Sequence, residues 1–428
     1  MKMLVKNGRV VDPASGIDET LDILIDKGKI VELKPQIKVE DVKTVDASRL
    51  VVAPGFIDMH VHLREPGQEN KETIRTGSLA AARGGFTTIC CMPNTVPPND
   101  NSGVTEYNLS EARKNAVVNV LPIAAISKGL KGEELADLAD LAAAGAVAFS
   151  DDGKPVANSL LMRRALEYAL PLKPFVIDHC EERSLSEDGH MHEGFCSHRF
   201  GIRGMPASAE EIMVARDIIL AEQAGARVHI AHLSVKGAAR CVREAKARKV
   251  RVTAEATPHH LVLTDAALET YDTNFKMNPP LRSEEDVEAL LDAVRDGTID
   301  VIATDHAPHA AEDKDQEFDL APFGITGLET AVSVLLDRLV HKKIIPLGRL
   351  VELCASNPAR ILGLDGKGRI GPGADADLVL LNLGKEIVVE AGEFMSKSRN
   401  SPFIGWKLKG TPVMTIVGGR IVYPFAKE

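Results

Sequence analysis

The sequence is poor in the features that mark secreted, membrane-spanning and nucleic-acid-binding proteins. Its 428 residues include only six cysteines, of which Cys90 and Cys91 alone are close together, so a disulfide framework is not expected. No stretch approaches the roughly 20 apolar residues of a membrane span, and residues 1–8 lack the apolar core of a signal peptide. The net charge of −10, without a dense lysine and arginine patch, argues against nucleic-acid binding. We therefore expect a cytoplasmic protein without a membrane or nucleic-acid partner.

The composition is that of a globular protein. Hydrophobic residues make up 44% of the chain and charged residues 26%, which is within the usual range. A chain of this length can form one large barrel with a smaller domain, or two or three ordinary domains.

The two ends of the chain have the same pattern of short β-like segments separated by Gly, Asp and Pro turn signals. The segments are residues 4–11, 22–25 and 29–33 near the start, and 376–382, 413–419 and 420–423 near the end. We predict that residues 1–53 and 366–428 pair into one small β-sandwich domain, with the middle of the chain inserted between them.

The middle, residues 54–365, alternates apolar strands with helical stretches. The predicted strands are residues 55–63, 87–93, 117–126, 146–150, 174–178, 227–233, 251–256 and 300–304. Helical spacing of apolar residues or a terminal glycine marks helices at 134–145, 209–226 and 284–297. Eight strand-then-helix units predict an α/β fold of the (β/α)8 TIM barrel type, with a doubly wound parallel sheet as the alternative.

Two histidines, His60 and His62, follow the first strand of the predicted barrel. Side chains two residues apart on a strand point to the same side, so both imidazoles can bind one metal ion. Ordinary packing would explain an isolated pair equally well. Arg64 lies two residues after His62, so its side chain is expected on the same side and places a fixed positive charge beside the two histidines.

Further polar residues follow the other predicted strands. They are Asn94 after the second strand, Asp151 and Asp152 after the fourth, His179 after the fifth, His232 after the sixth, Asn278 after the seventh, and Asp305, His306 and His309 after the eighth. Barrel enzymes place their chemistry at this carboxyl-terminal mouth. Histidines and carboxylates converging there favour a hydrolytic site with one or two metal ions.

Some of these residues also have ordinary structural explanations. Either Asp151 or Asp152 could cap a helix, and Asn278 with its two following prolines could form a plain turn. Strand alternation predicts that only one of His229 and His232 faces the barrel, and His232, nearer the strand end, is the predicted ligand. The residues expected to be structural or solvated are His259 and His260 beside a proline, His190, His192 and His198 in a polar loop, and the core cysteines Cys90, Cys91 and Cys180.

Residues 310–323 form a charged segment that follows the eighth predicted strand and ends next to the expected mouth. Barrel loops often gate access to an active site. We therefore expect either a mobile lid over the substrate or a solvated acidic loop.

In their order along the chain, these motifs resemble those of the amidohydrolase superfamily, and more narrowly the long-chain bacterial (class I) dihydroorotases. The matching segments are residues 54–67, 91–95, 150–153, 178–181, 232–234, 278–280 and 303–309, with 371–379 similar to the small β domain of such enzymes. One departure is Val235, where threonine is more usual, and this position lies beyond the predicted ligand.

The resemblance implies reversible cyclisation of N-carbamoyl-L-aspartate to L-dihydroorotate, a step of pyrimidine biosynthesis, with two zinc ions as cofactor. It implies that one zinc is held by His60, His62 and Asp305, that the other is held by His179 and His232, and that Asp152 bridges them. Asp152 would replace the carboxylated lysine of hydantoinases, and Asp305 would also transfer the proton.

The resemblance also implies which residues bind the substrate carboxylate: Arg64, Asn94 and His309, with Asn278 nearby. Arg64 suits a substrate with a free carboxylate, which a plain hydantoin lacks, and the segment 149–153 offers no lysine. Both points favour a dihydroorotase. A hydantoinase or allantoinase is the alternative enzyme, and a non-catalytic scaffold for aspartate carbamoyltransferase is the alternative of another class. A homodimer and a complex with that transferase are the partners the resemblance suggests.

Overall fold

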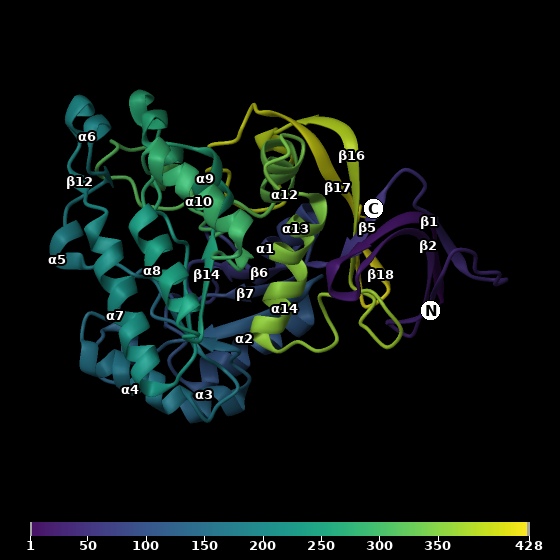
Figure 1. The fold of residues 1–428 in the computed structure, drawn as a ribbon, viewed down its shortest axis with the longest axis horizontal. Helices are drawn as coiled ribbons and strands as arrows, with labels where there is room; N and C mark the ends of the chain where they lie inside the picture. Colours follow the sequence, from purple (N-terminus) through teal and green to yellow (C-terminus); the bar gives the residue numbers. More distant parts are fainter. Residues whose placement is uncertain (1, 426–428) are drawn as a thin grey trace.

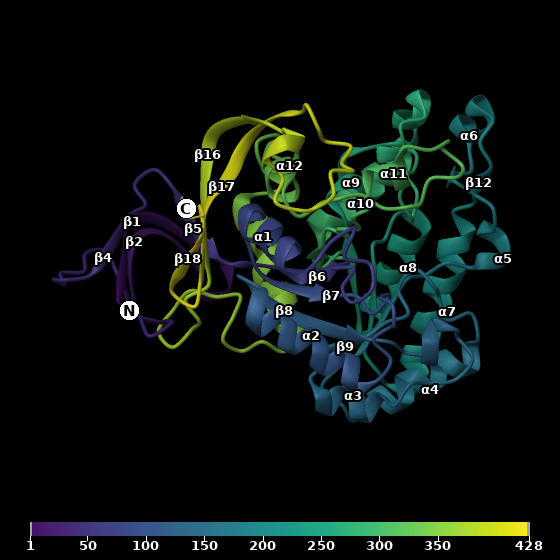
Figure 2. The same ribbon diagram turned by 180° about the vertical axis from the view of Figure 1, so that it is seen from behind.

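The computed structural model describes residues 2–425 and contains a parallel barrel beside a sheet made from both chain ends (Figure 1). Figure 2, the view from behind, shows the same arrangement, with the N-terminal strands in purple and the C-terminal strands in yellow next to one another.

Eight parallel strands form the barrel in sequence order. They are β6 (Phe56–Val61), β7 (Phe86–Cys91), β8 (Asn119–Ala124), β9 (Ala148–Phe149), β10 (Val176–Asp178), β13 (Val228–Ile230), β14 (Val252–Ala256) and β15 (Val301–Ile302). The two ends of this sheet meet through a parallel bridge between Val61 and His306, and the His62 N–H donates to the His306 carbonyl at 2.8 Å. The barrel is therefore nearly closed. All eight predicted strands are confirmed, and the doubly wound alternative is wrong.

Helices follow most of these strands and cover the outside of the barrel (Figure 1). They include α1 (Ile74–Gly84), α2 (Ser102–Asn115), α3 (Leu138–Ala144), α4 (Ser159–Ala169), α7 (Ser208–Ala224), α8 (Lys236–Ala247), α10 (Glu284–Asp296), α12 (Ala331–Leu335), α13 (Leu347–Val351) and α14 (Asn357–Leu362). The predicted helices correspond to α3, α7 and α10. Helix α3 begins later than predicted, because Leu135 forms a β-bridge with Ser127 and Asp137 then caps the helix.

Apolar side chains fill the interior of the barrel below the strand ends. Residues from six strands form one buried cluster with helix α14: Ile57, Met59, Cys90, Ile123, Ala148, Ile177, Val301, Ile361 and Leu362. On five of these six strands, all but β8, the apolar positions precede polar residues predicted for the site. The strands therefore carry a dry core at one level and chemical groups at their carboxyl ends.

The second sheet joins the two ends of the chain, as predicted. Its strands are β1 (Met3–Asp12), β2 (Ile17–Asp26), β3 (Lys29–Lys34), β4 (Lys43–Asp46), β5 (Val51–Pro54), β16 (Leu378–Val388), β17 (Lys407–Val417) and β18 (Arg420–Tyr423). They run in the order β18-β17-β16-β5-β1-β2-β3, with β4 paired to β1. The antiparallel pairing of β5 with β16 makes the connection, with Val52 opposite Leu380. This sheet has a buried core of its own.

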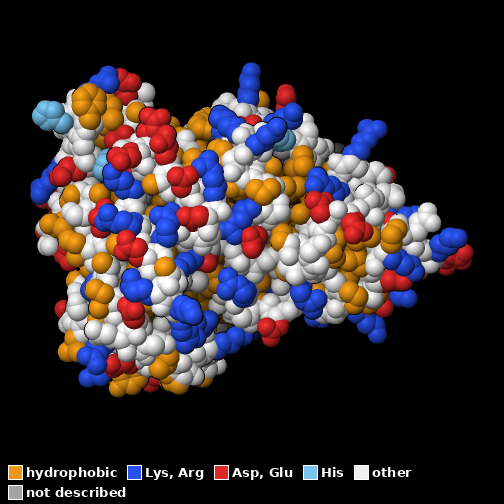
Figure 3. All heavy atoms as spheres, in the orientation of Figure 1, with side chains coloured by type: hydrophobic (Ala, Val, Ile, Leu, Met, Phe, Trp, Pro, Cys, Tyr) orange, Lys and Arg blue, Asp and Glu red, His pale blue; other side chains and the backbone are white. Residues whose placement is uncertain are grey.

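No helix among residues 2–425 is long and apolar enough to cross a membrane. Figure 3 shows acidic and basic side chains interspersed over one face of the molecule, with scattered hydrophobic groups between them. This face carries no dense basic patch.

Candidate metal centre

His60 and His62 lie at the carboxyl end of β6, where the pairing with β7 shifts register between Asp58 and Val61. The buried Asp58 carboxylate accepts the His60 N–H at 3.0 Å and the Thr304 N–H at 3.2 Å. It therefore ties the backbone of the first histidine to the strand end that precedes Asp305.

Asp152 lies among four histidines, as the predicted bridging role requires. Its Oδ1 atom is 3.3 Å from His60 Nε2 and 3.7 Å from both His179 Nδ1 and His232 Nε2. Its Oδ2 atom is 3.4 Å from His62 Nε2. One carboxylate thus faces the two predicted pairs of ligands with its two oxygens.

The neighbouring Asp151 does not face the histidines. Its Oδ1 atom accepts the backbone N–H groups of Ile126 and Ser127 at 2.8 and 3.0 Å. Of the two aspartates, Asp151 is therefore the structural one.

Asp305 completes the group around the first pair of histidines. Its Oδ1 atom is 3.1 Å from His62 Nε2 and 3.5 Å from His60 Nε2. Its backbone φ is +47°, and those of His232 and Arg64 are +31° and +61°. Left-handed backbone at a residue other than glycine costs about 1–3 kcal/mol and clusters at functional sites. These three residues turn sharply where their strands end.

The side chains present fit a metal-binding site. Ligand atoms of His60, His62 and Asp305 lie within 4.8 Å of one another, as do those of His60, Asp152 and His232. Within residues 2–425, the buried His60 Nε2 and Asp152 Oδ1 have no hydrogen-bond partner. Imidazole and carboxylate ligands together suit zinc and other divalent transition metals.

The charges of the site depend on one another. Burial by itself would raise the pKa of Asp152, but the facing imidazoles, His60 foremost, hold it well below its ordinary value. Burial opposes the protonation of His60, yet the carboxylates of Asp152 and Asp305 raise its pKa well above the usual range. A metal ion would take the place of these protons.

In three of the four histidines, the nitrogen turned away from the centre meets an oxygen acceptor, whereas among the described residues His232 Nδ1 has no hydrogen-bond partner. His60 Nδ1 is 2.7 Å from Glu255 Oε1, and His62 Nδ1 is 2.8 Å from Asn94 Oδ1. His179 Nε2 is 3.0 Å from Glu181 Oε2. Such partners fix the ring orientation and tautomer of metal-binding histidines.

Sequence reasoning missed Glu255 and Glu181. Glu255 is fully buried in β14, and a charged residue inside an otherwise apolar strand was the signal that could have found it. Glu181 follows His179 by two residues, and in an extended segment their side chains point to the same side. This spacing was the signal that could have identified Glu181.

The expectation that only one of His229 and His232 faces the barrel is wrong. His229 Nε2 is 3.1 Å from Glu255 Oε2, while the His232 backbone N–H donates to Glu255 Oε1 at 3.3 Å. Strand β13 ends at Ile230 and the positive φ of His232 breaks the alternation, so both residues reach the same carboxylate. Of these two histidines, His232 has its Nε2 atom 3.7 Å from Asp152 Oδ1, whereas His229 bonds to Glu255 and Thr253.

The predicted substrate-binding residues surround one cavity of about 210 Å³. Every predicted site residue except the fully buried His60 lines it: His62, Arg64, Asn94, Asp152, His179, His232, Asn278, Asp305 and His309. Arg64 Nε donates to the Pro308 carbonyl at 3.2 Å, and Asn278 Nδ2 donates to Glu181 Oε2 at 2.7 Å. Burial lowers the pKa of Arg64 to about 10, so its guanidinium is a cation at neutral pH.

The remaining predictions for histidines and cysteines have mixed outcomes. His260 is structural, since its ring bonds to Thr257 Oγ1 at 2.8 Å and to the Pro279 carbonyl at 2.9 Å. His198 is exposed as predicted, but His190 and His192 are half-buried, which corrects the expectation that they are solvated. The residues confirmed as buried are His259, Cys90, Cys91 and Cys180.

Comparison with known proteins shows similarity over the whole chain. Residues 48–238 match the family model described as Dihydro-orotase-like, and residues 327–423 match the model described as Amidohydrolase family. A dihydroorotase of Pelotomaculum thermopropionicum is 56% identical over 423 residues, which cover 99% of this chain and 98% of that protein. A dihydroorotase of Syntrophus aciditrophicus is 53% identical over 425 residues, which cover 99% of each chain.

Solved structures with the same fold come from related hydrolases. The L-hydantoinase (dihydropyrimidinase) from Arthrobacter aurescens has a TM-score of 0.89 at 27% identity, covering 98% of this chain and 95% of that one. The dihydropyrimidinase from Brevibacillus agri NCHU1002 has a TM-score of 0.86 at 25% identity, with the same coverage.

Proposed function

The chain belongs to the dihydroorotase family, and we propose that it catalyses the reversible cyclisation of N-carbamoyl-L-aspartate to L-dihydroorotate in pyrimidine biosynthesis. The observation that carries the proposal is the meeting of Asp152, Asp305 and Arg64 in one cavity with the histidines. Two carboxylates and histidines suit hydrolysis of an amide, and a buried guanidinium suits a substrate with a free carboxylate.

We infer that the cofactor is zinc, two ions per subunit. His60, His62 and Asp305 would hold the first ion, His179 and His232 the second, and Asp152 would bridge them. Bound zinc supplies a Lewis acid for the amide carbonyl and lowers the pKa of water from near 16 toward about 7. The unpartnered His60 Nε2 and Asp152 Oδ1 support this assignment.

Asp305 is the group that we assign to proton transfer. Burial would raise the pKa of its carboxyl, but His60 and His62 lower it far below the ordinary value, so the group is an ionised carboxylate. In the hydrolytic direction Asp305 accepts the proton of the attacking water and returns it to the departing ring nitrogen. Such general acid–base work contributes about 10² to 10⁴ in rate. For ring closure the same transfers run in reverse.

Arg64 is the group that we assign to the substrate carboxylate. A guanidinium binds a carboxylate through two parallel hydrogen bonds, and this would hold the scissile amide in one orientation at the metal centre. His309 lies beside it, with its Nε2 atom 3.5 Å from Arg64 Nη2. Burial, together with the cations of Arg64 and Lys71, lowers the pKa of His309 to about 2. His309 is therefore neutral and adds a polar contact without adding charge. Asn94 and Asn278 complete the substrate-binding set.

A hydantoinase is the second candidate, because the solved structures similar in fold include hydantoinases. Two features of the cavity count against it. None of the described residues that line the cavity is a lysine, so a carboxylated lysine has no position there. Arg64 would also face no carboxylate on a plain hydantoin ring.

The deciding experiment is an assay of the zinc-loaded protein against dihydroorotate, hydantoin and allantoin, with zinc stoichiometry measured on the same sample. We expect dihydroorotate to be opened fastest and two zinc ions per chain. Faster opening of hydantoin or allantoin would replace the proposal with the second candidate. Protein purified without chelators that binds no zinc would favour the non-catalytic scaffold.

We further propose a cytoplasmic location, a homodimer, and aspartate carbamoyltransferase as a partner, all supported by the family resemblance. Light scattering of the purified protein measures its mass, and co-elution with the transferase tests the complex. A monomer that elutes separately from the transferase contradicts both assembly proposals.

A further inference from the structure

Two buried lysines outside the metal centre have no acidic partner. Lys276 precedes Asn278 in the loop that follows helix α9 (Pro258–Val262), and Lys314 ends helix α11 (Ala311–Lys314) in the loop after β15. Their exposed fractions are 1% and 7%. Among residues 2–425, no carboxylate lies within 4.0 Å of either ammonium. Burial lowers the pKa of Lys276 to about 8 and that of Lys314 to about 7. A buried amine of this kind needs a specific set of hydrogen-bond acceptors.

The acceptors are backbone carbonyls of the two loops that carry these lysines. Lys314 Nζ donates to the carbonyls of Pro322 at 2.9 Å, Gly324 at 3.0 Å and Lys276 at 3.3 Å. An ammonium has three N–H donors, so all three are used. These bonds join the two ends of the 314–324 segment to each other and to the loop of Lys276.

Lys276 makes the reciprocal contacts. Its Nζ atom donates to the carbonyls of Phe318 at 2.7 Å and Asp319 at 3.0 Å, and it lies 4.8 Å from the centre of the Phe323 ring. Its own carbonyl accepts the Gly324 N–H at 3.0 Å. Each loop therefore holds the other through a lysine, and we name this arrangement of Lys276, Lys314 and their carbonyl acceptors the lysine clasp.

The clasp lies directly behind the wall of the substrate cavity. Gly324 and Phe323 line that cavity, and so does Asn278, two residues after Lys276. The Phe323 carbonyl accepts the His309 Nε2–H at 2.8 Å. Two predicted substrate-binding residues, Asn278 and His309, are thus attached to the two loops that the clasp joins.

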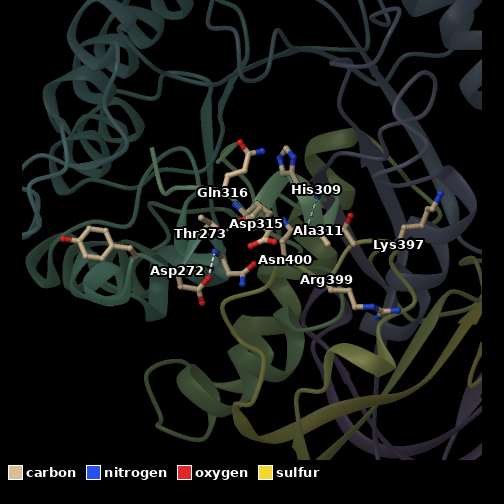
Figure 4. A pocket seen from close by; sticks show the side chains of 13 residues that line it. Asp272, Thr273, His309, Ala311, Asp315, Gln316, Lys397, Arg399 and Asn400 are labelled. Carbon is tan, nitrogen blue, oxygen red and sulfur yellow. Dashed lines mark hydrogen bonds between the residues drawn. The ribbon is translucent and has the colours of Figure 1, made fainter. Parts of the chain in front are cut away.

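Apolar packing covers only part of this wall, where Met277 and Phe318 belong to one buried cluster. A second cavity, of about 500 Å³, lies there between the two loops (Figure 4). Thr273 from one loop and Ala311, Asp315 and Gln316 from the other surround it, and His309 borders both cavities. Beside this packing, polar ties also cross between the loops. Besides the lysines these include the Thr273 hydroxyl, which donates to the Lys314 carbonyl at 2.6 Å.

We propose that Lys276 and Lys314 are positioning residues that set the width of the substrate cavity by fixing the Asn278 loop against the His309–Gly324 loop. The inference rests on the proposed function, because it assigns the substrate to that cavity. The inference also gives residues 310–323 a third interpretation, neither a mobile lid nor a solvated loop. The segment is an anchored wall, because Lys314 and Phe318 within it are both buried.

The test compares Lys314→Met with Lys236→Met in the zinc-loaded full chain. Lys236 is an exposed lysine paired with Glu285, so it controls for the loss of a charge. Losing the ammonium leaves buried carbonyls unsatisfied, so we expect KM for dihydroorotate to rise about tenfold. The clasp does not contact a metal ligand, so kcat and zinc content should change little. An unchanged KM would overturn the proposal, as would the same rise in the Lys236→Met control.

Hydrogen exchange supplies a readout that does not depend on the reaction. In Lys314→Met, the amides of residues 273–278 and 310–324 should exchange about tenfold faster together, while Lys236→Met should match the wild type. If the amides of both loops exchange at the wild-type rate in Lys314→Met, the lysine clasp does not hold the loops together. A wild-type protein with correct zinc content that does not act on dihydroorotate refutes the proposed function instead, and exchange then still decides whether the clasp exists.

A milder variant covers the case in which Lys314→Met does not fold. Thr273→Val removes only the hydroxyl tie to the Lys314 carbonyl. We expect a smaller rise of KM in the same direction with unchanged zinc content. An unchanged KM in this variant also counts against a positioning role for the joined loops.

Discussion

His60 Nδ1 lies 2.7 Å from Glu255 Oε1, and the other oxygen of that carboxylate lies 3.1 Å from His229 Nε2. His229 is held in turn by Thr253, whose Oγ1 atom is 2.8 Å from its Nδ1. Burial would raise the pKa of Glu255, but His60 and His229 lower it to about 2, so it is ionised. An ionised acceptor at Nδ1 keeps the Nε2 lone pair of His60 directed at Asp152 and Asp305.

Glu255→Gln should therefore weaken zinc binding without removing a ligand. Loss of an outer partner of a metal-binding histidine typically costs about 10- to 100-fold in affinity. Competition with a chromophoric chelator measures the effect, and Glu285→Gln on the surface is the matched control. If both variants bind zinc as the wild type does, Glu255 has no part in orienting His60.

Asp305→Asn should keep the fold but lose at least about 10²-fold in kcat, because the amide cannot accept the proton. Steady-state kinetics with dihydroorotate measure the loss, and circular dichroism checks the fold. Asp292→Asn, on an exposed position of helix α10, should behave as the wild type. Wild-type turnover by Asp305→Asn would exclude Asp305 as the proton-transfer group.

Arg64→Lys should raise KM for dihydroorotate by about tenfold or more, because an ammonium cannot form two parallel bonds to a carboxylate. Zinc content should not change, since Arg64 is not a predicted ligand. Opening of an unsubstituted hydantoin, if measurable, should be affected less. An equal effect on both substrates would show that Arg64 does not recognise the carboxylate.

Removal of the metal should destabilise the protein. A ligand that binds only the folded state at 1,000 times its dissociation constant contributes about 4 kcal/mol. Thermal unfolding with and without a chelator measures the change, and the Tm should recover when zinc is restored. A Tm that is insensitive to the chelator, with zinc confirmed absent, contradicts a bound metal pair at this site.

Zinc affinity should fall as the pH is lowered. In the metal-free protein the facing carboxylates raise the pKa of His60, and Glu181 and Asp152 raise that of His179, although burial opposes both shifts. A protonated histidine must release its proton to bind zinc, so these raised pKa values make protons compete with the metal. Calorimetry in two buffers of different ionisation enthalpy counts the released protons, and release of none at pH 7 contradicts the shifts.

The local pattern of the sequence was sufficient for the barrel and for the polar groups that gather at its mouth. Apolar segments of strand length, each followed by a polar residue, identified the eight strands and placed His60, His179 and Asp305 at their ends. Alternation failed only where a strand stopped early: β13 ends before His232, whose positive φ no periodicity could predict.

By itself the sequence therefore determined the strands of the barrel, the pairing of the two chain ends in a second sheet, and the chemical groups at the mouth of the barrel. It could do so because periodicity and residue type are local properties. Only the tertiary structure decided which groups support them. Glu255 meets His60 across 195 residues of chain, and Lys314 meets the Lys276 carbonyl across 38. The physical reason is that closing the barrel brings β14 against the site and folds the long loops over it, and these contacts between distant segments leave no periodic trace in the sequence.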